Sequence, residues 1–287
     1  MKKILFNLPI IALMGLVFLG SCGKKDEDPT GSAITLSKSN PVPNENVTVS
    51  AEILVSNIRE VVLTKRLGSG AETTLDTKTY TSNQKDLRVD FGTISFDAPG
   101  TYTLTVTAYN NATPKAVLAT IQQTVTVTPT VRTASAVVLG DQAASSPSYL
   151  TLTSSSIITV SSANVTNTNV DLNFVSLPTP VVATSVSHFI SPDTRSAEGF
   201  TTNTGITRAT FIGTTSLAYN ASATDIWNAS APTTKKVSVS ANTVYLFQNA
   251  DGNKGLIRVS SVSGTPLGAN RTVQIDVRIL EQAPLPL

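Results

Sequence analysis

The chain has 287 residues, of which 14% are charged, and its formal net charge is only +2. This balance excludes a strongly basic nucleic-acid-binding surface, because no basic run exceeds pairs such as Lys24-Lys25 and Lys235-Lys236. A single cysteine excludes an internal disulfide, so folding has to rest on the burial of apolar side chains. The length is near the limit for one hydrophobic core, and two domains are therefore expected.

The N-terminus begins with a positively charged MKK start and continues as an apolar run over residues 4–19. This run is shorter than the roughly 20 apolar residues that a transmembrane helix needs, and Pro9 interrupts it. A plain secretory signal would end in an A-x-A-like site, whereas here small residues lead directly into Cys22. The LGSC motif that ends at Cys22 resembles the lipobox of bacterial lipoproteins. The resemblance implies that residues 1–21 are a cleaved signal peptide and that an acylated Cys22 anchors the protein in a membrane.

Residues 22–32 are expected to form a solvated tether, because the stretch GKKDEDP after Cys22 has no apolar side chain to bury. This stretch resembles the acid-containing export signals of surface lipoproteins in the Bacteroidota. The resemblance implies an outer-membrane lipoprotein exposed on the cell surface. An Asp at the second position after the cysteine would resemble an inner-membrane retention signal, but Lys24 occupies that position. An anchor that faces the periplasm is the alternative.

Most of the remaining chain is predicted to be β-structure, because short runs rich in Val, Ile, Thr, Tyr and Phe alternate between apolar and polar residues. No stretch of about a dozen residues keeps a helical apolar period, so only short helical turns are expected. The expected strands are residues 46–53, 60–66, 87–96, 100–109, 123–128, 237–240, 244–248, 255–262 and 272–280. The predicted fold class is all-β, with an immunoglobulin-like β-sandwich followed by a second, larger β-sandwich-like domain.

Residues 33–130 have the length of an immunoglobulin-like sandwich. The sequence DAPGTYTL, which contains Tyr102 and Leu104, resembles the E–F corner and strand F of such domains. The resemblance places Tyr102 at the tyrosine corner and Leu104 at a core position of strand F. The same stretch also resembles the last strands of PKD-type bacterial surface repeats, although the WDFGDG signature of PKD domains is missing. We interpret Tyr102 as a core residue held by a hydrogen bond and not as a ligand contact.

The joint between the domains is expected at residues 129–131, so that residues 131–287 form a C-terminal β domain. This part resembles uncharacterised C-terminal domains of Bacteroidota lipoproteins in residues 136–140, 169–174, the Ser191-Pro192 step, Trp227 and residues 255–259. The resemblance implies a fold and a compartment, but no activity.

Few residues could carry chemistry. His188 is the only histidine, which excludes H-E-x-x-H zinc sites and histidine clusters. It lies in an alternating, strand-like stretch and no G-x-S-x-G elbow occurs, so no catalytic residue is assigned. With no P-loop and no G-x-G-x-x-G, neither a cofactor nor a metal is expected. Residues 249–253 lack the spaced carboxylates of a calcium loop and predict a hairpin turn. A pair of carboxylates suited to glycoside hydrolysis stays open, because the spacing of the acidic residues singles out no pair.

Three functions remain open. The first is a non-enzymatic cell-surface module for binding or adhesion to a glycan or a protein. The second is a structural or accessory subunit of an outer-membrane uptake assembly, and the third is a β-sandwich hydrolase. The expected partners are outer-membrane lipid through the acylated Cys22 and a glycan or protein ligand, with no nucleic acid.

A ligand site is predicted within residues 191–231, which are rich in Thr, Ser, Asn and Ala and are expected to form long loops at one end of the sandwich. The stretch contains Phe200, Phe211, Tyr219 and Trp227. Of these, Phe200, Tyr219 and Trp227 are the candidate ligand-binding residues, because exposed rings provide sugar-stacking faces or protein hot spots. The alternative is that the rings pack beneath the loops as a satellite core.

Overall fold

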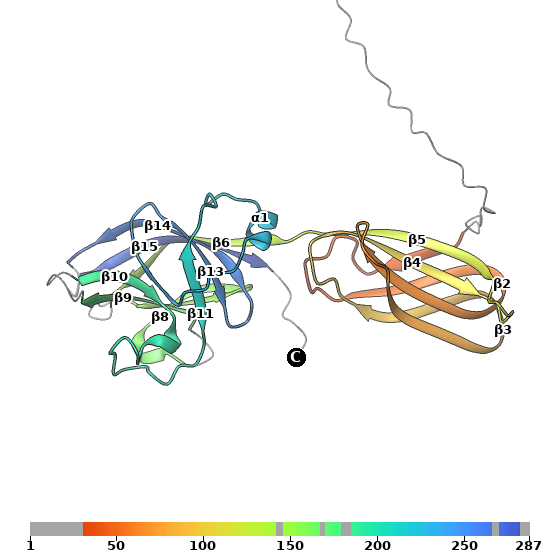
Figure 1. The fold of residues 1–287 in the computed structure, drawn as a ribbon, viewed down its shortest axis with the longest axis horizontal. Coiled ribbons are helices and arrows are strands. Elements are labelled where there is room, and N and C mark those ends of the chain that lie inside the picture. The colour runs from red at the N-terminus through yellow and green to blue at the C-terminus, as the bar shows by residue number, and fades with distance from the viewer. Residues whose placement is uncertain (1–30, 142–145, 167–169, 179–184, 266–269, 282–287) are drawn as a thin grey trace, which may run out of the picture.

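A computed structural model describes residues 31–141, 146–166, 170–178, 185–265 and 270–281 of the chain (Figure 1). The regular secondary structure of these residues is almost all strand, with a single six-residue α-helix, which confirms the all-β, sandwich-like fold class. The expected signal peptide, Cys22 and nearly all of the tether lie outside the described residues. Within the described residues, no helix has the length and apolar character needed to cross a membrane.

The first unit of the fold contains the strands β1 (Ala33–Leu36), β2 (Val47–Leu67), β3 (Thr73–Ile94), β4 (Gly100–Tyr109) and β5 (Val117–Val127). They are hydrogen-bonded in the order β1-β2-β4-β5, and β3 also pairs with β2. All these pairings are antiparallel. One cluster of buried apolar residues, from Ile34 to Val127, forms the core of this unit.

β2 is one long strand at a place where the sequence predicted two, at residues 46–53 and 60–66. Its first half pairs with β1 and the end of β3, and its second half pairs with the start of β3 and with β4. Register shifts between Ile53 and Glu60 interrupt the ladder, and Asn57 has a φ of 68° there. Such bulges bend a strand without ending it. Because β1 also contacts β5, the bent β2–β3 hairpin closes over a single core.

Tyr102 of β4 makes the contacts that a tyrosine corner requires. Its side chain is 2% exposed, and its hydroxyl donates to the carbonyl of Ala98 at 3.1 Å. The backbone N–H of Ala98 donates to the hydroxyl oxygen of Tyr102 at 3.3 Å. The ring packs on Phe96 with a centroid distance of 4.8 Å, and Leu104 is fully buried. The corner predicted from the sequence is therefore present, and it fixes the turn that leads into β4.

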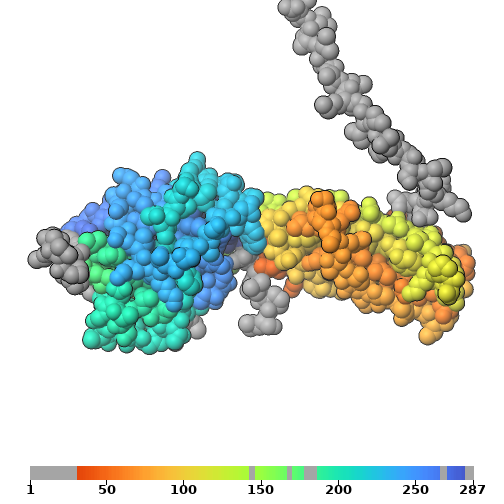
Figure 2. Space-filling model, viewed as in Figure 1, coloured from red at the N-terminus to blue at the C-terminus, as the bar shows by residue number. Residues whose placement is uncertain are grey.

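Only Thr128 and Pro129 separate β5 from β6 (Thr130–Gly140), which belongs to a different sheet. The N–H of Thr128 donates to the carbonyl of Pro41 at 3.2 Å. Thr130, which the sequence assigned to the first domain, is instead the first residue of β6, because it pairs with Glu281 of the second unit. The two units lie end to end and the chain passes between them at this point (Figures 1 and 2).

The second unit holds two five-stranded antiparallel sheets. One sheet, here called the β14 sheet, has the order β11-β13-β14-β15-β6, and the other, the β9 sheet, has the order β12-β10-β9-β7-β8. Their strands besides β6 are β7 (Tyr149–Thr153), β8 (Ser156–Val160), β9 (Leu172–Pro178), β10 (Ser185–Ile190), β11 (Thr210–Thr214), β12 (Lys236–Ser238), β13 (Val244–Asn249), β14 (Lys254–Ser263) and β15 (Thr272–Glu281). The helical elements are η1 (Ser162–Asn164), η2 (Pro192–Thr194) and α1 (Ala223–Asn228).

The core of the second unit lies between these two sheets. Phe174 of β9 and Phe189 of β10 meet edge to face at 6.0 Å, and Tyr245 of β13 packs on Phe189 at 5.7 Å. All three rings are essentially unexposed. Because strand side chains alternate, the neighbours of these residues point to the outer faces of the sheets, where the connecting segments cover them.

Candidate functional site

Residues 191–231, predicted as long loops at one end of the sandwich, have a different course. They include the strand β11, and two of their other parts pack on the outer faces of the two sheets. Phe200 packs on Val175 and Ile190 outside the β9 sheet. The part around α1 packs on Leu246 and Leu256 outside the β14 sheet. The expectation of loops at one end was wrong, because each sheet has an apolar outer face that needs cover.

Phe200 covers a buried arginine. Arg195 is only 1% exposed, and its guanidinium lies 4.3 Å from the Phe200 ring centroid and 5.3 Å from that of Tyr149. Its Nε donates to the carbonyl of Thr202 at 3.1 Å, and its Nη1 donates to the side-chain oxygen of Asn173. Burial lowers the pKa of Arg195 below its ordinary value. Phe200 therefore shields a cation that has neutral hydrogen-bond partners.

Tyr219 and Trp227 belong to the cluster on the opposite side of the unit. Both are half-buried against the outer face of the β14 sheet. The Tyr219 ring lies 4.5 Å from the guanidinium of Arg258 and 5.8 Å from that of Arg278. Arg278 also donates to the carbonyl of Tyr219, which ties this segment to β15. Phe200 thus does not share a surface with Tyr219 and Trp227, and a ligand role for the three stays a prediction.

Helix α1 is formed by a local sequence signal. Ser222 is its N-cap, and the N–H of Asp225 donates to the Ser222 hydroxyl at 3.1 Å. The Asp225 carboxylate accepts from the N–H of Ser222 at 3.0 Å, which completes a capping box. At the other end, the ammonium of Lys254 donates to the carbonyls of Trp227 and Ala229. These contacts hold α1 over the β14 sheet and fix the start of the segment that follows it.

That segment, residues 229–234, crosses the outer side of β11 and is here called the strap. Its far end is held by Thr234, whose hydroxyl donates to the carbonyl of Ile212 at 2.5 Å and whose carbonyl accepts from the N–H of Ile212 at 2.8 Å. In the middle, Pro232 lies against Gly213, where an added Cβ would be 3.5 Å from the Pro232 Cβ. The strap therefore touches the sheet at Pro232 and leaves room on both sides.

Two open hollows flank the strap. The first hollow, of about 850 Å³, is lined by residues 213–217, the strap, residues 236–238 and Leu246. The second hollow, of about 460 Å³, is lined by residues 231–233 of the strap, by Ala209 and Phe211 and by residues 248–250. Both share the strap residues 231–233 as a wall. Together the hollows form the candidate functional site.

Phe211 is the large apolar side chain that this site leaves in solvent. It is 38% exposed, whereas Phe200, Tyr219 and Trp227 pack against apolar clusters. It pairs across the strands with Gln248, so the ring and the carboxamide lie side by side on the outer face of the sheet. The sequence had placed Phe211 in the same stretch without choosing it, because exposure in a polar stretch is decided by packing and not by local pattern.

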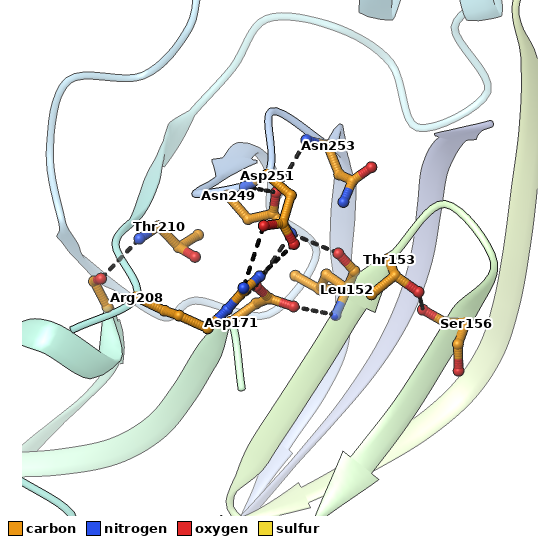
Figure 3. Close-up of polar contacts among 10 residues, drawn as sticks. Leu152, Thr153, Ser156, Asp171, Arg208, Thr210, Asn249, Asp251 and Asn253 are labelled. Atoms are coloured by element: carbon orange, nitrogen blue, oxygen red, sulfur yellow. Dashed lines mark hydrogen bonds and ion pairs between the residues drawn. The ribbon is translucent and has the colours of Figure 1, made fainter. Parts of the chain in front are cut away.

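A charged network fixes the strand that carries Phe211 (Figure 3). Arg208 Nη2 lies 2.7 Å from the carboxylate of Asp171, which is 1% exposed, and 2.6 Å from that of Asp251, which is 50% exposed. Asn249 donates to Asp171 at 3.1 Å and to the carbonyl of Leu152 at 2.6 Å. Burial raises the pKa of Asp171, although the Arg208 guanidinium opposes this. The network ties the start of β11 to β7 and to the β13–β14 turn.

The turn over residues 249–253 is a hairpin turn, as the sequence predicted. The N–H of Asn249 donates to the carbonyl of Asn253 at 3.0 Å, and Gly252 has a φ of 78°, which favours glycine. The side-chain oxygen of Asn249 accepts from the N–H groups of Asp251 and Asn253. Among the described residues, no group of three or more His, Cys, Asp or Glu side chains is arranged to hold a metal ion.

His188 lies on β10 opposite Ser238 of β12, and Ser238 lines the first hollow. Its Nε2 is 3.2 Å from the Ser238 hydroxyl oxygen, and its Nδ1 is 2.9 Å from the carbonyl of Val186. A Ser-His-Asp triad would place a carboxylate at Nδ1, whereas here a main-chain carbonyl occupies that position. Burial lowers the pKa of His188. We interpret the Ser238–His188 contact as a cross-strand hydrogen bond.

The chain was compared with models of protein families, with curated proteins and with solved structures, and no match was found in any of the three.

Proposed function

We propose that the protein is a non-enzymatic, lipid-anchored surface protein of the outer membrane, whose second unit binds a glycan or a protein through the two hollows beside the strap. The observation that carries the binding role is the pair of open hollows next to the exposed ring of Phe211. Ligand sites are concave and combine apolar surface with a few convergent polar groups, and this face of the β14 sheet has both.

The anchoring part of the proposal rests on the lipobox-like sequence at Cys22 and on the acidic tether after it. Acyl chains contribute about 0.8 kcal/mol for each buried methylene, so two or more chains give a stable attachment. In this arrangement the first unit follows the anchor in the chain and the second unit, which carries the hollows, comes after it.

The anchor is tested by Cys22→Ala. Without an acylated cysteine the protein should be released from membranes or remain unprocessed, which fractionation and the mass of the mature chain will show. A Cys22→Ala protein that is processed and still bound to membranes would refute a lipid anchor. The orientation is tested by adding protease to intact cells: cleavage is expected on the surface, whereas protection until lysis would indicate the periplasmic face.

The binding role is tested by cross-linking on intact cells and by probing the detergent-solubilised full chain with a panel of oligosaccharides. Retention of a glycan, or capture of one specific protein, is expected. If neither is found, the second open function gains support, namely that of a structural or accessory subunit of an outer-membrane assembly. The compact joint at Thr128 and Pro129 is compatible with such a spacer role.

A further inference from the structure

We propose that the second hollow binds an uncharged sugar ring, which stacks on Phe211 and receives hydrogen bonds from Gln248 and Thr233. This inference rests on the proposed function, since it names the ligand class of the same site. It decides between the glycan and the protein that the proposed function leaves open.

Phe211 presents an exposed ring to the second hollow. Phe211 lines the hollow together with the apolar residues Ala209 and Pro232, and it is 38% exposed. The Arg208 network holds the start of the strand that carries the ring, and the ammonium of Lys235 lies over the ring, 5.6 Å from its centroid. A fixed aromatic ring in an open hollow offers a flat apolar face, and the C–H face of a sugar ring is a matching surface.

Two polar side chains that line the same hollow as this ring have free hydrogen-bonding capacity. Neither the carboxamide of Gln248 nor the hydroxyl of Thr233 makes a side-chain hydrogen bond to any described residue. The carboxamide offers two donors and an acceptor, and the hydroxyl can act as either. An apolar side chain of a protein partner would bury these groups without partners, which costs free energy. A sugar presents hydroxyl groups next to its C–H face, and these can form hydrogen bonds with the Gln248 carboxamide and the Thr233 hydroxyl.

The charges around the two hollows favour an uncharged ligand. Among the described residues that line the second hollow, none is charged. Lys235 carries a nearby positive charge, but it is paired with Asp193. In the first hollow Lys236 is paired with Glu198 at 2.8 Å. The described residues that line the two hollows therefore offer no unpaired cation to an anionic group, and the site favours a neutral sugar over a uronate, a sulfated sugar or a phosphate.

The first hollow extends the same chemistry across the strap. Its lining includes the hydroxyl side chains of Thr214, Ser216 and Ser230, which make no side-chain hydrogen bond to the described residues. Because the strap residues 231–233 line both hollows, a ligand in the second hollow lies directly beside the first. The ligand class is therefore a neutral oligosaccharide, with one unit on Phe211 and a further unit in the first hollow.

The test uses the detergent-solubilised full chain and an array of neutral, uronate-containing and sulfated oligosaccharides. A neutral oligosaccharide should bind, and Phe211→Ala and Gln248→Ala should each weaken its binding at least about tenfold, as expected for central contacts of a site. Phe211→Trp keeps a stacking ring and should retain binding. The matched control is Ile158→Ala, which truncates another exposed apolar side chain, 52% exposed, on the edge strand β8 outside this site. As a control, the unfolding midpoint of each variant is measured and should stay close to that of the parent protein, which checks that the fold is kept.

The outcomes separate this inference from the proposed function. If a glycan binds but Phe211→Ala and Gln248→Ala behave like Ile158→Ala, the assigned site is wrong while the proposed function stands. If only anionic glycans bind, or if cross-linking captures a protein through Phe211 and no neutral glycan binds, the sugar class is wrong. If neither a glycan nor a protein binds, both the inference and the proposed function fail.

Discussion

Removing Arg208 should destabilise the second unit far more than removing its exposed partner. Arg208→Met leaves the carboxylate of Asp171, which is 1% exposed, without a countercharge. Breaking a buried ion pair on one side costs about 3–5 kcal/mol. Asp171 keeps the N–H of Leu152 at 2.7 Å and the amide of Asn249 at 3.1 Å, so we expect the lower end, about 3 kcal/mol. Asp251→Asn removes only the half-exposed partner and should cost about 1 kcal/mol or less.

The assay is urea unfolding followed by the fluorescence of Trp227, the only tryptophan, which lies in the second unit. Because burial raises the pKa of Asp171 above its ordinary value of 3.8, the folded state of Arg208→Met binds a proton more readily than the unfolded chain. The loss of stability should therefore be small below pH 3.8 and grow as the pH rises through the folded-state pKa.

A double variant serves as the second control. Combining Arg208→Met with Asp171→Asn makes the buried group neutral and should recover most of the lost stability. The reasoning is refuted if Arg208→Met costs no more than Asp251→Asn, or if its cost is the same at acidic and neutral pH.

Three further predictions concern stability. Tyr102→Phe should cost on the order of 1–3 kcal/mol, because Ala98 loses its hydrogen-bond partner; calorimetry should show a lower first-unit transition with an unchanged Trp227 signal. Burial lowers the pKa of His188 below its ordinary 6.5, so its contribution should be present above pH 6.5 and lost as the pH falls; His188→Asn should remove that part of the pH dependence of the unfolding midpoint, and an unchanged profile would contradict it. Gly255→Ala should cost about 1–3 kcal/mol, because its Cβ would collide with the carbonyl of Arg278; equal urea midpoints for variant and parent would show that the strands can yield.

The sequence predicts those strands that have one buried apolar face and one exposed polar face, because their residues alternate. Residues 100–109 were predicted to be a strand, and β4 spans the same residues, because its core residues alternate with threonines. β7 was not predicted, because Tyr149, Leu150, Thr151 and Leu152 are all buried and the strand shows no alternation. β11 was missed for a different reason: it is short and lies in a stretch of Thr, Ser and Asn.

The candidate site was only partly accessible from the sequence. The stretch that the sequence singled out contains Phe211, but the sequence could not show which of its rings stays exposed, because that depends on which outer face each segment covers. Arg208 lies 37 residues from Asp171 and 43 residues from Asp251 in the sequence, so no local sequence pattern predicts the network. Long-range pairs of this kind form only when the sheets are in place.

The pairing of β6 with β15 makes the second unit a module that could be grafted elsewhere. Its first and last described residues, Thr130 and Glu281, are cross-strand partners, and the Thr130 hydroxyl donates to the Glu281 carboxylate at 2.7 Å. A segment whose two ends are adjacent can be inserted into a surface loop of another protein without forcing that loop apart. For the same reason, a fluorophore placed just after Glu281 would report on the boundary with the first unit and not on the hollows.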